Sequence, residues 1–157
     1  MKLQTQIPLK KQKDALISYQ SKILLLGSCF SENIGNKLSY YKFQSNQNPF
    51  GILFHPKAIE NLITRALNNK SYTAQELTFN NERWHCFDAH SSLSSSDKTE
   101  LLLHLNSALM QTKKQLEVAT HISITLGTSW VYRHLENDLI VANCHKVPQK
   151  KFSKELL

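Results

Sequence analysis

Cysteine and glycine are both scarce in this sequence, and each scarcity excludes a class of site. The chain holds three cysteines, Cys29, Cys86 and Cys144, an odd number without a CxxC pair. That set is a poor framework for disulfides and for a structural zinc ion. The four glycines form neither a P-loop nor a GxGxxG fingerprint. We therefore expect no metal and no cofactor.

Long apolar runs are also missing. No stretch approaches the roughly 20 apolar residues that a membrane helix needs. The first 20 residues carry four lysines and no continuous apolar segment of the kind that signal peptides contain. With 157 residues, 41% of them hydrophobic and 20% charged, the composition fits one soluble globular domain. We expect a cytoplasmic protein that does not bind membranes.

A basic face is lacking too, although the net charge is +7. Residues 1–22 hold five lysines against Asp14, and residues 146–157 hold four lysines against Glu155. The stretch between them, 23–145, carries ten basic and ten acidic side chains and is neutral. Since the positive charge belongs to the two ends, we expect solvated termini and no nucleic-acid partner.

The hydrophobic pattern predicts one domain, residues 22–157, preceded by a basic N-terminal arm, residues 1–21. Four aliphatic residues that run into Gly27 predict a strand buried on both faces. Apolar stripes at helical spacing predict two longer helices, the second of them opened by a capping-box pattern. The expected elements are strand 23–26, helix 31–40, strand 40–44, loop 45–49, a helix from 56 to 67, an irregular segment 72–96, helix 97–118, strand 122–126, a hairpin of 130–134 with 139–142, and an amphipathic segment 150–157.

This order of strands and helices predicts an α/β fold whose parallel sheet is covered by helices. In such sheets ligands bind at the carboxyl ends of the strands. Gly27, Gly51 and Gly127 all fall where those ends or their loops should lie.

The tripeptide Gly27-Ser28-Cys29 is the clearest candidate for chemistry. A nucleophile gains from a strand-to-helix turn because backbone amides and the helix dipole face the developing oxyanion there. Glycine lets the backbone turn without a Cβ clash. Taken alone, the same pattern is also typical of a buried strand, a tight turn and a helix start with no catalytic role.

Four motifs in order give this turn a context: "GSCF" at 27–30, "NPFGILFHP" at 48–56, "WHCFDAHS" at 84–91 and "TLGTSWVYR…VANCHKVPQ" at 125–149. Together they resemble the GSCFA family, which is grouped with the SGNH (GDSL-like) hydrolases. The resemblance runs from about Leu24 to the last residue. It departs at Ser31, where the family motif has alanine.

The resemblance implies a flavodoxin-like, three-layer α/β/α sandwich with a mainly parallel sheet and an ester-hydrolase site. By position, Gly51 corresponds to the glycine that helps to hold the oxyanion. Gly127, Thr128 and Ser129 correspond to the third block, with Ser129 where asparagine is usual. Asn143 is the alternative source of that amide.

Two neighbouring residues compete as the nucleophile. In the register of the GDS motif the nucleophile is Cys29, whereas adjacency to Gly27 favours Ser28. Cys29 is the better intrinsic nucleophile once a base activates it. The sequence leaves both open, with Cys29 preferred.

The superfamily's last block, an aspartate three residues before a histidine, has no counterpart after Val147. We therefore expect the front portion of a longer domain, apparently truncated at its C-terminus and inactive alone. Within it, Asn48, Asp88, His90 and His145 are the candidates for lining the substrate pocket. Each histidine also fits a purely structural, hydrogen-bonded role.

The resemblance implies an SGNH-like hydrolase or acyltransferase acting on a small-molecule or carbohydrate ester, such as an acylated carbohydrate. The alternative is a catalytically silent module of the same fold that binds an acyl or sugar ligand. The sequence leaves the oligomeric state open.

Overall fold

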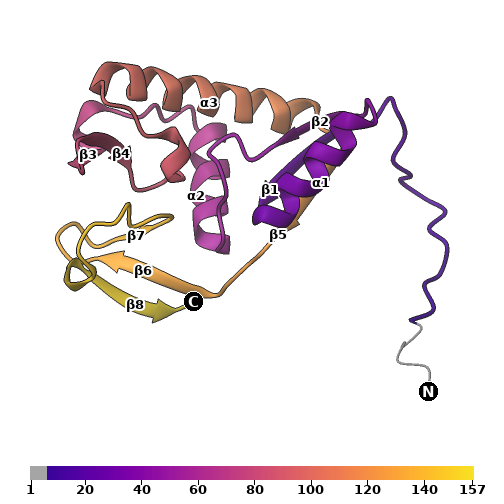
Figure 1. The fold of residues 1–157 in the computed structure, drawn as a ribbon. Coiled ribbons are helices and arrows are strands. Elements are labelled where there is room, and N and C mark those ends of the chain that lie inside the picture. The colour runs from indigo at the N-terminus through magenta and orange to yellow at the C-terminus, as the bar shows by residue number, and fades with distance from the viewer. Residues whose placement is uncertain (1–6) are drawn as a thin grey trace.

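The computed structural model describes residues 7–157, so the first six residues of the predicted basic arm lie outside the described residues. Residues 7–21 form neither helix nor strand, and Ala15 of this arm accepts a hydrogen bond at 2.9 Å from His121 Nε2. The described residues form three α-helices and eight strands (Figure 1). The helices are α1 (Cys29–Tyr40), α2 (Pro56–Leu67) and α3 (Lys98–Val118). The strands are β1 (Lys22–Gly27), β2 (Gln44–Gln47), β3 (Leu77–Asn80), β4 (Arg83–Cys86), β5 (His121–Thr125), β6 (Trp130–His134), β7 (Leu139–Val141) and β8 (Phe152–Leu156).

A three-stranded parallel sheet, ordered β2-β1-β5, is the centre of the fold. β1 is buried on both faces: Leu24 and Leu26 pack into one core with α2 and α3, while Ile23 and Leu25 alternate to the opposite face, where α1 lies. The predicted α/β fold with a parallel sheet is therefore confirmed. The aliphatic run of β1 explains it, because only a strand covered by helices on both sides can bury four such residues.

The remaining strands form two antiparallel sheets. β3 and β4 make a hairpin, and β6 pairs with both β7 and β8. Figure 1 shows the β7-β6-β8 sheet at the far end of the extended link that follows β5. The fold thus combines a small parallel sheet with two antiparallel ones.

Four local expectations were wrong. The first helix begins at Cys29, because Ser28 caps it two residues earlier than expected. The strand expected at 40–44 is a helix end and turn, and β2 lies in the polar run that was expected to be a loop. The segment 72–96, expected to be irregular, contains the β3–β4 hairpin. The amphipathic segment 150–157, to which no element was assigned, contains β8. In β2 the backbone pairing with β1 outweighs the low strand propensity of its polar side chains.

No helix within residues 7–157 combines the length and the apolarity needed to cross a bilayer.

Candidate functional site

The β1–α1 turn depends on a glycine at its first position. Gly27 has φ +128°, and a Cβ added there would lie 2.0 Å from the carbonyl oxygen of Thr125 on β5. Its amide donates to Asn48 Oδ1 at 2.9 Å, and its carbonyl accepts from Leu53 N at 2.9 Å. The carboxyl ends of β1 and β5 therefore meet closely, and the loop after β2 is tied to the same point.

A chain of hydroxyl groups lies beneath this turn. Ser28 Oγ is 3.0 Å from Thr125 Oγ1, which is 2.7 Å from Ser31 Oγ, which donates to the Leu26 carbonyl at 3.1 Å. If each hydroxyl donates once, Ser28 donates to Thr125, Thr125 to Ser31, and Ser31 to Leu26. Ser28 Oγ also accepts the Phe30 amide as the N-cap of α1. The proton of Ser28 is thus held in the turn rather than directed at solvent.

Cys29 differs from Ser28 in its surroundings. It is the first residue of α1 and its side chain is exposed to solvent. As the first helical residue, its amide has no acceptor within the helix, and the helix dipole favours negative charge nearby. Of the two competing nucleophiles, Cys29 is therefore the one whose side chain is free to reach a ligand.

The loop from Asn48 to Gly51 forms one wall of a cavity of about 330 Å³, and Asn48 joins this wall to the turn through its bond with the Gly27 amide. Ser28 and Cys29 do not line the cavity. Gly51 has φ +72°, and a Cβ there would lie 2.4 Å from His90 Cβ, so glycine permits the close approach of these two segments. Asn48 Nδ2 is buried without a hydrogen-bond partner among the described residues. The other lining residues are Glu32, Gln47, Pro49, Ile52, His90, Ser92 and Leu93.

Hydrogen bonds fix the tautomer of His90. Its Nδ1 accepts the Ser92 amide at 3.3 Å, with Ser92 Oγ at 3.1 Å. Because Nδ1 is an acceptor, Nε2 carries the proton of the neutral ring. His90 is therefore suited to donate a hydrogen bond to a ligand in the cavity.

The third predicted block lies close to the turn, but its backbone amides are already used. Gly127 N and Thr128 N both donate to the Phe54 carbonyl, at 2.7 and 3.1 Å. Ser129 accepts a hydrogen bond from the Leu157 amide through its carbonyl. The Gly51 amide is also engaged, donating to Asn48 O at 2.7 Å. An oxyanion at this end of the sheet would thus find the Cys29 amide more readily than those of Gly51 or Gly127.

Asp88 faces a different part of the molecule from the turn. Its carboxylate accepts from Tyr72 Oη at 3.2 Å and lies 3.8 Å from Arg65 Nη1. Burial raises the pKa of Asp88, and the neighbouring Arg65 guanidinium opposes that shift. No histidine within residues 7–157 hydrogen-bonds to Asp88 or forms an ion pair with it.

Asn143 and His145 also lie apart from the turn, under the β3–β4 hairpin. Asn143 N donates to the Phe87 carbonyl at 3.3 Å, and Asn143 Oδ1 accepts the His145 amide at 2.8 Å. The His145 ring is 4.6 Å from the ring of His85, and its Nε2 donates to the Cys86 carbonyl at 2.7 Å. His145 is 5% exposed and does not line the cavity that Glu32 and His90 line.

Burial of His145 makes stability depend on pH. Desolvation lowers its pKa to about 4 from 6.5, so the unfolded chain takes up a proton more readily than the folded one. The stability that comes from keeping His145 neutral is therefore fully present above pH 6.5 and is lost as the pH falls toward 4. We expect the unfolding free energy to drop by about 2 kcal/mol between pH 7 and 5 through this group alone.

Urea unfolding at both pH values checks this expectation. His145→Gln should remove most of the difference, whereas His104→Gln, at an exposed position of α3, should leave it unchanged. Equal pH dependence in the parent and His145→Gln chains would contradict the assignment.

Sequence patterns did not identify two parts of this site. Glu32 lines the cavity one helical turn after Cys29. The spacing of three residues, which places two helical side chains next to each other, could have identified it. Thr125 contacts the turn from β5, 97 residues away from Ser28, and no local pattern marks such a contact. Within residues 7–157, His, Cys, Asp and Glu side chains do not gather in groups of three or more that could hold a metal ion.

The model of the GSCFA family matches residues 22–157. No curated protein and no solved structure matches the chain.

Proposed function

The chain belongs to the GSCFA family, and on that premise we propose that it is an acyl-transfer domain of the SGNH hydrolase type with Cys29 as its nucleophile. One observation carries the proposal: an exposed thiol stands at the first residue of a helix, at the carboxyl end of a parallel sheet. Glu32, one turn further along the same helix, lines a cavity. Helices on both faces of that sheet also support the finer assignment of a flavodoxin-like α/β/α sandwich.

The proposed substrate is an ester of a small molecule or a carbohydrate. Glu32, one turn after Cys29, takes the thiol proton, and the sulfur attacks the ester carbonyl. The Cys29 amide donates to the resulting oxyanion. The bond from carbon to the alcohol oxygen then breaks, the alcohol leaves with the proton from Glu32, and a thioester remains. Water, or an acceptor alcohol, attacks the thioester and restores the thiol.

An activated ester tests this proposal. We expect p-nitrophenyl acetate to acetylate Cys29 of the native chain much faster than the same residue of the urea-unfolded chain, as followed by nitrophenolate release and mass spectrometry. Ser28→Ala should keep the labelling and Cys29→Ala should abolish it. Glu32→Gln should slow it by about 10²-fold, the usual lower range for removal of a general base. Acetylation no faster in the native chain than in the unfolded one would reject a catalytic Cys29.

A second candidate function is a catalytically silent module that binds an acyl or sugar ligand. The observation favouring it is that no histidine within residues 7–157 hydrogen-bonds to a carboxylate, so the usual SGNH base is not assembled there. This function predicts ligand binding that persists in Cys29→Ala and Ser28→Ala, with no turnover in the parent chain.

A further inference from the structure

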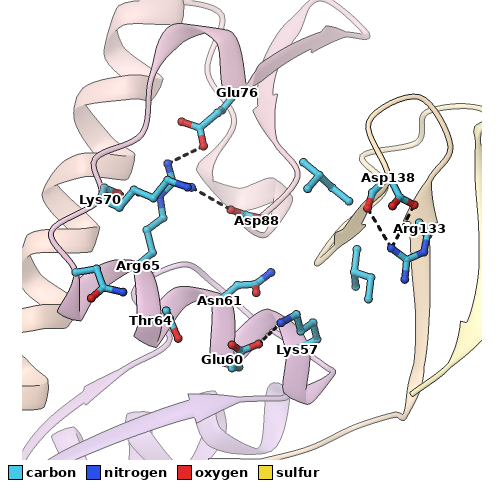
Figure 2. A pocket seen from close by; sticks show the side chains of 13 residues that line it. Lys57, Glu60, Asn61, Thr64, Arg65, Lys70, Glu76, Asp88, Arg133 and Asp138 are labelled. Atoms are coloured by element: carbon cyan, nitrogen blue, oxygen red, sulfur yellow. Dashed lines mark hydrogen bonds and ion pairs between the residues drawn. The ribbon is translucent and has the colours of Figure 1, made fainter.

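A second cavity is separate from the one that Glu32 and His90 line. It has a volume of about 560 Å³ and lies between α2, the segment around Asp88 and the β6–β7 hairpin (Figure 2). The two cavities share no lining residue. Its volume falls within the range of about 300–1,000 Å³ that is typical of small-molecule sites.

The hairpin is held against α2 by a specific contact. His55, the N-cap of α2, accepts the Ala58 amide at Nδ1 and donates from Nε2 to the Val141 carbonyl of β7 at 3.0 Å. Both partners of this bond are buried. The two walls of the cavity are therefore tied together, which favours a preformed site.

The charges around this cavity compensate one another. Four basic and four acidic side chains line it, and all but Lys70 form ion pairs. Paired charges present oriented hydrogen-bond donors and acceptors without a net field that would attract a free ion. The ion pairs are Lys57–Glu60, Arg65 with Glu76 and Asp88, and Arg133–Asp138.

The wall formed by α2 adds uncharged hydrogen-bonding groups. Asn61, Thr64 and the C-cap residue Asn68 follow one another at spacings of three and four residues, and all three line the cavity. In Figure 2 the Asn61 side chain points from α2 toward the hairpin that carries Arg133 and Asp138. The hydrogen bonds within residues 7–157 leave the side-chain amides and hydroxyl of these three residues unused.

An apolar strip completes the cavity on the side of β7. Leu139 and Ile140 line it opposite the polar face of α2. A ligand that suits all three walls is neutral, carries many hydroxyl groups and has apolar C–H faces. We propose that this cavity is a carbohydrate-binding site, holding a mono- or disaccharide unit through α2 and β7. The proposal goes beyond acyl transfer and does not require Cys29 to react.

Titration of the ¹⁵N-labelled 157-residue chain with maltose, cellobiose and N,N′-diacetylchitobiose tests it. We expect saturable shifts of the Asn61 and Asn68 side-chain amide signals with at least one sugar, with a Kd on the order of 1 mM. The Asn61→Ala/Thr64→Val chain should bind that sugar roughly tenfold more weakly, or worse, because it lacks two hydrogen-bonding groups. Gln111→Ala, at an exposed position of α3, is the matched control and should bind as the parent does.

Three outcomes test this site independently of the proposed chemistry at Cys29. Cys29→Ala should leave sugar binding unchanged, so failure of the acyl-transfer proposal does not affect this one. Shifts of the same signals by inorganic phosphate, with none by the sugars, would overturn the proposal in favour of an anion site at Lys70. The absence of saturable shifts with all three sugars would also overturn it.

Discussion

Gly27→Ala is expected to destabilise the chain by about 4 kcal/mol or more, a loss comparable with the whole stability of many small domains. Gly27 has φ +128°, a conformation that L side chains rarely adopt, and strain of this kind costs about 1–3 kcal/mol by itself. The added Cβ would also lie 2.0 Å from the backbone oxygen of Thr125. Since that oxygen accepts the Ser28 amide, β5 must move away from β1 to make room.

Gly127→Ala is the matched control for this prediction. Gly127 lies at the same end of the sheet without a positive φ, and its added Cβ would meet the partly exposed ring of Phe54 at 2.9 Å. That ring can turn aside, so we expect a loss of about 1 kcal/mol or less. Urea unfolding followed by circular dichroism measures both. A Gly27→Ala chain as stable as the Gly127→Ala chain would contradict the role assigned to the turn.

The parts of the fold that could be predicted from sequence are those whose burial pattern is local. Four aliphatic residues before Gly27 predicted β1, and the apolar stripe of α2 predicted a helix that does bury Ala58, Ile59 and Leu62. β2 was missed because its polar side chains carry no strand signal. Its stability comes from backbone pairing with β1, which depends on the strand beside it rather than on its own sequence.

In the candidate site, too, the local features could be predicted from sequence and the long-range contacts could not. The turn at Gly27-Ser28-Cys29 could be located from sequence, because a strand, a glycine and a cap are neighbours along the chain. The sequence placed Asp88 with the pocket histidines, but the structure places it against Arg65 and Tyr72. Such long-range partners depend on how α2 packs against the segment after β4. No spacing in the sequence encodes that contact.

Arg65→Met is expected to destabilise the chain by about 2–3 kcal/mol, within the range of about 1.5–3 kcal/mol that hydrogen bonds to charged groups contribute. The Arg65 side chain is 10% exposed and is bonded to Glu76 at 2.6 Å and to the carbonyls of Lys70 and Ser71 at 2.8 and 3.0 Å. Its guanidinium also lies 3.7 Å from the centroid of the Tyr72 ring. Methionine keeps most of the aliphatic stem, so the loss measures the guanidinium rather than a cavity.

Arg65→Lys should recover only part of this loss. A lysine keeps the positive charge but lacks the planar fork that reaches two carbonyls and a carboxylate together. Stability of the three chains, measured by urea unfolding at pH 7, gives the order parent, Arg65→Lys, Arg65→Met. Equal stability of Arg65→Lys and the parent would mean that charge alone matters at this position.

A double-mutant cycle with Asp88→Asn separates the carboxylate from the other partners of Arg65. Without the guanidinium, the half-buried Asp88 carboxylate stays beside Tyr72 without its cation, and burial already raises the pKa of Asp88. The double variant leaves no carboxylate at position 88 without its cation, so it should be more stable than the sum of the single losses predicts. We expect a coupling of about 1–3 kcal/mol, as contacting residues usually show. Additive losses would mean that the 3.8 Å separation of Arg65 and Asp88 is too long for a stabilising pair, and that Glu76 and the two carbonyls account for the whole effect of Arg65.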